Sequence, residues 1–207
     1  MLTLEEKDFM ARGGERECFF HPSDSKKIIK ILYKKNGTYA YGGSRNNIEY
    51  KYYKFLEKSK IPFLHISKCY EFVDTNLGKG LVFDKICDYD GNTSAPLTQI
   101  ILKKRLNTQT ETLVMNELKD FIFKNNILFI DNALNNILCC EYEKSKFRLI
   151  IIDGLGGKRE GFKFWFYLHS KMYTKYKIRK QWKDFIKKYT FFKKNLIKYK
   201  KGRDKNK

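Results

Sequence analysis

Three polar residues near the middle of the chain have the types and spacing that phosphoryl transfer requires. Asp131 and Asn136 are separated by four residues, and Asp153 follows a later apolar segment. Transfer of a γ-phosphoryl group needs a carboxylate to orient the accepting hydroxyl, and further oxygen ligands to hold Mg²⁺ against the phosphates. Asp131 fits the first role, and Asn136 and Asp153 fit the second.

The segments around these residues predict how they are brought together. Residues 137–142 and 147–152 are rich in apolar residues and predict a β-hairpin. This hairpin would return Asp153 to the loop that carries Asp131 and Asn136. The same letters also fit an ordinary turn, because Asp, Asn and Asp-Gly are common turn residues. Alone, the stretch leaves a phosphoryl-transfer site and a plain β-turn as equal alternatives.

A second group of candidate residues lies nearer the N-terminus. Gly13 and Gly14 separate two β-prone segments, and glycines in such a turn let backbone amides approach phosphates. Lys30 lies in the isoleucine-rich segment 26–33, and a buried ammonium needs a carboxylate or phosphate partner. The alternative for Lys30 is an alternating strand that directs the lysine into solvent.

Helices and strands are predicted around both groups. Apolar residues at helical spacing predict helices over 45–58 and 111–126, and Glu49 lies beside the apolar face of the first. A polar linker with glycines precedes it at 36–44. Turn signals at 21–24 and 76–78 join the predicted strands into hairpins, the second of which uses strands over 63–73 and 80–87. These elements predict an α+β fold.

Composition sets further limits. The 207 residues, 42% of them hydrophobic, are enough for one domain with a core or for a small domain with an extension. No run approaches the ~20 apolar residues of a membrane span, and the first ten residues do not resemble a signal peptide, so a cytoplasmic protein is expected. Five cysteines without C-x-x-C spacing and three scattered histidines indicate neither a disulfide framework nor a zinc site.

The net charge of +20 is concentrated at the C-terminal end. Residues 158–207 hold 19 Lys and Arg against 3 acidic residues. Aromatic and aliphatic residues between the lysines predict two or three amphipathic helices, which we interpret first as the completion of a short C-terminal lobe with a solvated lysine face. The alternatives are an anionic membrane surface and, ranked lower, nucleic acid.

Taken together, these residues resemble a known family. The similar motifs are Gly13-x-x-Arg16-x-Cys18-x-x-His21-Pro22, Ile29-Lys30-Ile31, Glu49-x-Lys51-Tyr52-Tyr53, Asp90-Gly91 and Asn136-Ile137-Leu138-Cys139. They resemble the PhoP regulatory network protein YrbL family over about residues 3–157 and, more loosely, 182–186. The resemblance implies a bacterial protein with a protein-kinase-like bilobal fold.

The implied lobes divide the chain into three parts. Residues 1–87 would form an N-lobe with a five-stranded antiparallel sheet and one or more helices. Residues 88–157 would form the hinge and the catalytic core of a short, mostly helical C-lobe, and residues 158–207 its basic, aromatic-rich helices and tail. The kinase roles carried over are Lys30 to the α- and β-phosphates of ATP, Glu49 as partner of Lys30, Gly13 and Gly14 as a reduced phosphate loop, Asp131 as base, and Asn136 and Asp153 to Mg²⁺.

The chain departs from the kinase pattern around these residues. Phe129-Ile130 replace His-Arg before the base, Ala133 replaces a lysine after it, and Gly154-Leu155 replace Phe-Gly after Asp153. No Ala-Pro-Glu segment follows. The expected activity is therefore ATP- and Mg²⁺-dependent phosphate transfer to a non-protein acceptor, such as an envelope sugar. The alternatives are a pseudokinase regulatory or binding module linked to the PhoP response, and a polyanion-binding protein that uses the basic tail.

Overall fold

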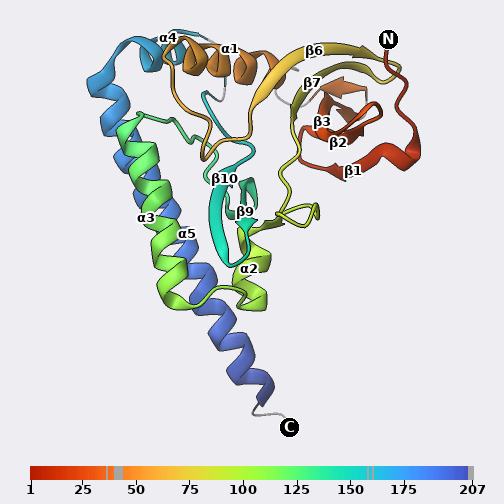
Figure 1. Ribbon diagram of the computed structural model, residues 1–207. Coiled ribbons are helices and arrows are strands. Elements are labelled where there is room, and N and C mark those ends of the chain that lie inside the picture. Colours follow the sequence, from red (N-terminus) through yellow and green to blue (C-terminus); the bar gives the residue numbers. More distant parts are fainter. Residues whose placement is uncertain (36, 40–43, 158, 160, 205–207) are drawn as a thin grey trace. The chain divides into compact units, whose positions relative to one another are not determined.

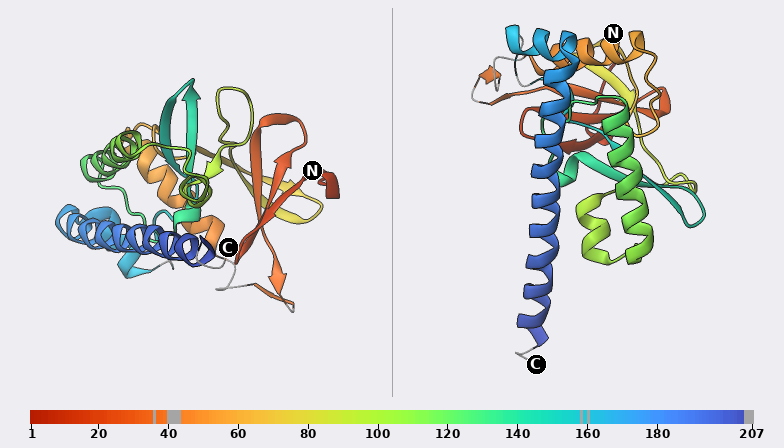
Figure 2. Two further views of the ribbon diagram at one scale, coloured as in Figure 1. Left: turned by 90° about the horizontal axis from the view of Figure 1, so that it is seen from below. Right: turned by 90° about the vertical axis from the view of Figure 1, so that its left-hand side faces the viewer.

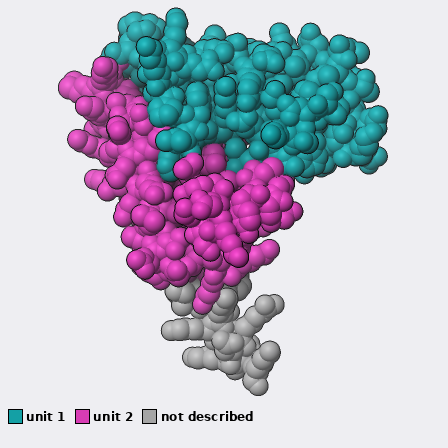
Figure 3. Space-filling view, in the orientation of Figure 1, with its two compact units in different colours: residues 1–86, 155–169 teal, residues 87–154, 170–207 magenta. Residues whose placement is uncertain are grey.

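The structure is a computed structural model that describes residues 1–35, 37–39, 44–157, 159 and 161–204. Contacts along the chain define two compact units (Figure 3). Unit 1 comprises residues 1–86 and 155–169, and unit 2 comprises residues 87–154 and 170–207. The segment after Asp153 therefore returns to unit 1 before the chain enters its last helix.

A five-stranded antiparallel sheet forms the centre of unit 1 (Figure 1). Its strands, in spatial order, are β1 (Phe9–Arg12), β2 (Arg16–His21), β3 (Asp24–Leu32), β7 (Gly78–Asp84) and β6 (Cys69–Thr75). The expected hairpins are confirmed, with turns at Gly13-Gly14, after His21 and before Gly78. Together with the helices, this sheet confirms the mixed α+β class.

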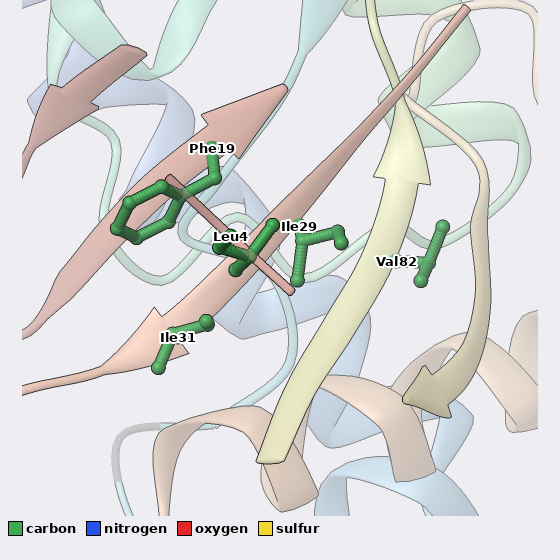
Figure 4. Packing of buried hydrophobic residues seen from close by; sticks show 5 residues of the cluster. All are labelled: Leu4, Phe19, Ile29, Ile31 and Val82. Carbon is green, nitrogen blue, oxygen red and sulfur yellow. The ribbon is translucent and has the colours of Figure 1, made fainter. Parts of the chain in front are cut away.

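One face of the sheet carries an apolar cluster. Figure 4 shows its members, which are Leu4, Phe19, Ile29, Ile31 and Val82. Ile29 and Val82 face each other across the β3–β7 ladder, and residues two apart on a strand share a face. Lys30 lies between Ile29 and Ile31, so its side chain is directed to the opposite face of the sheet.

Helix α1 (Arg45–Lys58) packs against the sheet with the bounds that the sequence predicted. Its residues Ile48, Tyr52 and Leu56 recur every four positions and are fully buried. Tyr53 makes an edge contact with Phe83 of β7, with ring centroids 5.6 Å apart. This packing places Glu49, which follows Ile48, inside the unit instead of in solvent.

Two details of unit 1 differ from the sequence-based expectation. The strand predicted to begin at residue 63 begins at Cys69, and Ser67 before it bonds the Asp84 carbonyl through its side-chain hydroxyl at 3.1 Å. The linker predicted over 36–44 includes strand β5 (Thr38–Tyr39), which pairs with β4 (Lys34–Lys35). Residues 36 and 40–43 of that linker lie outside the described part of the chain. A one-turn helix, η1 (Glu6–Asp8), precedes β1.

Unit 2 combines a small antiparallel sheet with helices. Its elements are β8 (Ala95–Pro96), α2 (Leu97–Lys103), α3 (Thr108–Lys124), η3 (Leu134–Asn136), β9 (Ile137–Glu143), β10 (Lys146–Ile151) and α5 (Lys171–Asp204). The predicted β9–β10 hairpin is confirmed. Helix α3 begins three residues earlier than predicted, because the Asn107 side chain caps it by accepting the Thr110 N–H at 2.8 Å.

The basic C-terminal segment folds into two helices, within the predicted two or three. Helix α4 (Phe162–His169) belongs to unit 1, and α5 belongs to unit 2, where it lies beside α3 (Figures 1 and 2). The buried side of α5 is formed by Thr174, Ile178, Gln181 and Phe185, spaced by three or four residues. Among the described helices, none has the length and apolar character needed to cross a membrane.

Candidate functional site

Unit 1 contains a buried polar cluster that spans β2, β3 and α1. Its members are Arg16, Lys30, Asn46 and Glu49, and each is at most 5% exposed. Burying a charged side chain is costly unless hydrogen bonds or an opposite charge compensate. The contacts inside this cluster therefore decide whether it can be stable.

The Glu49 carboxylate accepts a hydrogen bond from the Arg16 guanidinium. Arg16 Nη1 also donates to Asn46 Oδ1 at 3.0 Å, and Asn46 Nδ2 donates to the backbone carbonyl of Lys30 at 3.0 Å. Asn46 thus ties β2 and β3 to α1. Sequence reasoning missed Arg16 and Asn46 as site residues, although Arg16 belonged to the family motif. The pairing of Glu49 with Lys30 stays a prediction.

Lys30 is only 3% exposed, so the solvent-facing alternative for this lysine is wrong. Its ammonium lies 4.1 Å from the centroid of the Phe83 ring. The pKa of the Cys69 thiol depends on the charges of Glu49 and Lys30. Burial raises the pKa of Cys69, the Glu49 carboxylate raises it further, and the Lys30 ammonium lowers it. The two opposite charges therefore act on the same small region of the sheet.

The turn between β1 and β2 carries Gly13 and Gly14. Gly13 N–H donates to the Arg16 carbonyl at 2.8 Å, and the Tyr33 hydroxyl donates to the carbonyls of both glycines at 3.2 and 3.1 Å. A Cβ added at Gly14 would meet no atom of the described chain within 4 Å. Packing inside the protein does not demand glycine there, and the open space suits a ligand that approaches the backbone closely.

In unit 2 the structure brings Asp131, Asn136 and Asp153 together. Asn136 Nδ2 donates to the Asp131 carbonyl at 2.9 Å, and Asp131 N–H donates to the Gly154 carbonyl at 3.0 Å. Gly154 N–H in turn donates to Asp153 Oδ1 at 2.6 Å. These bonds link the loop before β9 to the segment after β10. Asp131 remains exposed, whereas Asp153 is half-buried.

Gly154 makes this close approach possible. Its φ of +87° lies in the region that favours glycine, and a Cβ at this position would lie 2.4 Å from the Asp131 carbonyl oxygen. The Gly154-Leu155 pair that departs from the kinase pattern therefore still includes a glycine with a defined steric role. It sets the separation between the Asp131 and Asp153 segments.

A further buried residue, Asn132, anchors the Asp131 loop to α5. Asn132 is 4% exposed, its Nδ2 donates to the Gln181 carbonyl at 2.6 Å, and its Oδ1 accepts from Lys188 Nζ. Sequence reasoning missed this role, because the partners are 49 and 56 residues away along the chain. The long basic helix thus contributes directly to the position of the candidate site.

The oxygen donors in unit 2 match the preference of Mg²⁺ for carboxylate and amide ligands. The Asn136 Nδ2 donates to the Asp131 backbone carbonyl, and this leaves the Asn136 Oδ1 as an acceptor. No cluster of three or more His, Cys, Asp or Glu side chains arranged for a metal occurs in the described part of the chain. A Mg²⁺ ion held by Asn136 and Asp153 would complete its shell with water and phosphate oxygens.

The predicted residues therefore form two sets. Lys30, Glu49 and the two glycines belong to unit 1, and Asp131, Asn136 and Asp153 belong to unit 2. Each set is held by hydrogen bonds within its own unit.

The chain is similar in sequence to known proteins over most of its length. Residues 2–190 match the family described as PhoP regulatory network protein YrbL. The chain is 30% identical over 159 residues to the protein YrbL of Escherichia coli (strain K12). The aligned residues cover 75% of this chain and 74% of that protein. The same values apply to YrbL of Shigella flexneri. The matched range includes both sets of candidate residues.

Proposed function

The chain belongs to the PhoP regulatory network protein YrbL family, and we propose that it is an atypical kinase-fold protein that binds ATP and Mg²⁺ and phosphorylates a non-protein acceptor, such as an envelope sugar. The observation that carries the proposal is the convergence of Asp131, Asn136 and Asp153 in unit 2. It supports phosphoryl transfer over the plain-turn alternative, because hydrogen bonds join the loop of Asp131 and Asn136 to the segment of Asp153, which lies beyond the β9–β10 hairpin.

Each of these side chains has a role that fits its surroundings. Asp131 is exposed, as a group that orients an incoming hydroxyl must be. Asn136 and Asp153 are restrained by backbone hydrogen bonds, as ligands of a cation should be. When bound, Mg²⁺ would neutralise charge on the phosphates.

Unit 1 supports the nucleotide-binding half of the proposal. A five-stranded antiparallel sheet with one packed helix, a buried lysine on the sheet and a buried glutamate on the helix suit a kinase N-lobe. In the proposed bilobal arrangement Lys30 would contact the α- and β-phosphates, and the Gly13-Gly14 turn would bind beside them. Arg16 adds a feature of this chain, a guanidinium that already neutralises Glu49.

The acceptor class follows from the chain after Asp153. Only residues 154–161 lie between Asp153 and α4, and no Ala-Pro-Glu sequence occurs there. In protein kinases the corresponding segment carries the activation loop, which ends at that motif. The short segment favours a small acceptor over a folded protein substrate.

A pseudokinase module linked to the PhoP response is the second candidate function. The observation that favours it is the Arg16–Glu49 ion pair, since the glutamate that a kinase uses to position its lysine already has a guanidinium partner. In this case nucleotide binding would set conformation without turnover.

Thermal unfolding with ATP, with and without Mg²⁺, tests the proposal. A ligand that binds only the folded state raises its stability by RT ln(1 + [L]/Kd). We expect a Mg²⁺-dependent rise in Tm for the wild type, loss of that rise in Lys30→Met and Asp153→Asn, and retention in Asp120→Asn, whose side chain is exposed on α3. A folded wild-type protein that shows no shift contradicts the proposal.

An ADP-release assay with envelope sugars separates the two candidate functions. Turnover that disappears in Asp131→Asn, with ATP binding retained, supports transfer. Mg²⁺-dependent binding without turnover supports the pseudokinase.

A further inference from the structure

The outward side of α5 concentrates positive charge. Opposite its buried residues lie five exposed cations, which we call the basic face: Arg179, Lys180, Lys183, Lys187 and Lys194. Their spacing of one to seven residues keeps them on one side of a helix with 3.6 residues per turn. The buried side of α5 therefore carries no charged residue among Thr174, Ile178, Gln181 and Phe185, whereas the opposite side is basic.

In the described part of the chain, the basic face has no acidic partners that neutralise its charge. Asp184 is the single acidic residue of α5 before its last turns, and it is separated from the next acid by twenty positions. Two other lysines of α5 have partners, since Lys193 pairs with Glu111 at 2.7 Å and Lys188 donates to Asn132. Among the residues that the structure describes, no carboxylate pairs with a cation of the basic face. A polyanionic partner would supply the missing charge.

Large apolar side chains are exposed beside these cations. Met172 is 83% exposed, Tyr176 is 64% exposed and Phe191 is 68% exposed. Met172 and Tyr176 precede the basic face at helical spacing, and Phe191 lies between its last two members. A face that alternates cations with exposed rings and a thioether differs from an ordinary solvated lysine surface.

Helix α4, which precedes α5 along the chain, exposes two more aromatic rings. Phe162 is 77% exposed and Trp165 is 52% exposed, whereas Phe164 is buried and would contact a Cβ at Gly157. The Phe162 and Trp165 rings stack with centroids 5.9 Å apart, and the His169 ring stacks on Trp165 at 4.5 Å. Both neighbours lie on the same helix, so the cluster is fixed within unit 1.

We propose that the basic face of α5 and the exposed rings of α4, each within its own unit, bind an anionic lipid surface. Lys and Arg side chains are attracted to anionic headgroups, and Trp, Tyr and Phe rings prefer the boundary between headgroups and acyl chains. This proposal does not rest on the proposed phosphate transfer.

The ring contacts favour lipid over nucleic acid. Proteins that hold single strands stack unpaired bases on the open faces of aromatic rings. Trp165 already stacks against both Phe162 and His169, so its ring has stacking partners within the protein. Insertion among headgroups requires no further stacking partner. Met172 likewise offers apolar surface without a ring or a hydrogen-bond donor for bases.

Sedimentation with vesicles tests the basic face. The full chain is mixed with vesicles of phosphatidylcholine alone or with added phosphatidylglycerol, at low and high salt. We expect binding to the anionic vesicles only, weakened by salt. The triple variant Lys180→Glu/Lys183→Glu/Lys187→Glu should bind about a hundredfold more weakly, because each lysine near an anionic surface contributes about fivefold.

A matched control makes an equal change in net charge elsewhere in unit 2. Lys103→Glu/Lys119→Glu/Lys144→Glu alters three exposed lysines on α2, α3 and the β9–β10 turn, and circular dichroism checks that both variants fold. Binding of the control should stay within about threefold of wild type, because screening confines the effect to charges near the surface. Equal losses in the two variants overturn the assignment of the basic face.

Tryptophan fluorescence tests α4. Anionic vesicles should shift the emission of the wild type to shorter wavelength, and Trp165→Phe should abolish that shift, because Trp182 is packed against Phe123 and Phe185. An unchanged shift in Trp165→Phe overturns the role of α4. Salt-sensitive binding to single-stranded DNA or RNA without binding to anionic vesicles overturns the lipid assignment and gives the face to nucleic acid.

Discussion

The guanidinium of Arg16 on β2 donates to the carboxylate of Glu49 on α1, and both side chains are almost completely buried. This pair joins the first hairpin of unit 1 to the helix that packs on its sheet. Asn46 supports it from the same helix by accepting from Arg16 at 3.0 Å. A buried pair with added hydrogen bonds contributes to the rigidity of unit 1, and its loss has a measurable cost.

Removal of the guanidinium should destabilise unit 1. We expect Arg16→Met to lower the free energy of unfolding by about 3 kcal/mol, because Glu49 loses its partner in a site without water access. The double variant Arg16→Met/Glu49→Leu should recover part of that loss, since no charge is then left buried. Urea denaturation of the single and double variants measures both effects.

The matched control is Arg12, whose ion pair with Glu17 leaves Arg12 61% exposed. Arg12→Met should cost less than about 1 kcal/mol, as exposed pairs do. Equal costs at Arg12 and Arg16 would show that burial does not set the value of the Arg16–Glu49 pair.

The contact between Gly154 and Asp131 predicts a steric effect. Gly154→Ala should destabilise unit 2 by about 3 kcal/mol or more, because the strain of positive φ adds to the clash with the Asp131 carbonyl. Gly91→Ala is the control, since Gly91 has a φ of +84° and nothing within 4 Å of an added Cβ. We expect a cost of about 1 kcal/mol there from φ alone. Thermal unfolding compares the two, and a cost at Gly91 equal to that at Gly154 contradicts the steric argument.

The buried Cys139 of β9 predicts how fast this thiol reacts with an alkylating reagent. Burial raises the pKa of Cys139 to about 12, with the Asp88 carboxylate acting in the same direction. The thiolate is the reactive form, so native Cys139 should react with iodoacetamide at pH 8 at least about a thousandfold more slowly than in urea, where a thiol pKa is near ~8.5. Mass spectrometry of the labelled peptide measures both rates. Rapid labelling of folded protein would place Cys139 outside the core.

The sign of the linked stability change follows from the same pKa. An unfolded thiol releases its proton above about pH 8.5, whereas native Cys139 keeps it until near pH 12. The unfolded state then binds fewer protons, so this residue contributes a loss of stability as pH rises above about 8.5.

The sequence predicted the elements that depend on local pattern. Gly13-Gly14 and Pro22 mark turns, and the Ile48, Tyr52 and Leu56 spacing defines α1 with correct bounds. The isoleucines on both sides of Lys30 also form a local pattern, and they favoured burial of this lysine. In each case the signal and the structure that it specifies lie within about ten residues of each other.

The contacts that fix the candidate residues could not be predicted in this way. Arg16 reaches Glu49 across 33 residues, and Lys188 reaches Asn132 across 56. Such pairs depend on which faces pack together, which periodicity within one element does not specify. The family resemblance implied Lys30 as the partner of Glu49. That Arg16 also pairs with Glu49 became visible only in the tertiary structure.

The bond between Lys188 and Asn132 predicts that α5 supports the Asp131 loop. Lys188→Met removes one partner of a buried amide and should cost about 1–2 kcal/mol. Lys187→Met changes the neighbouring lysine, which belongs to the basic face, and should stay within about 0.5 kcal/mol. Hydrogen exchange should also become faster at residues 129–136 in Lys188→Met alone, because the loop loses its anchor. If the protein transfers phosphate as proposed, turnover should fall in Lys188→Met with ATP binding retained, since Asp131 adjoins the released amide. Identical exchange in the two variants would mean that Lys188 does not restrain the loop, and that α5 supports unit 2 through its buried side only.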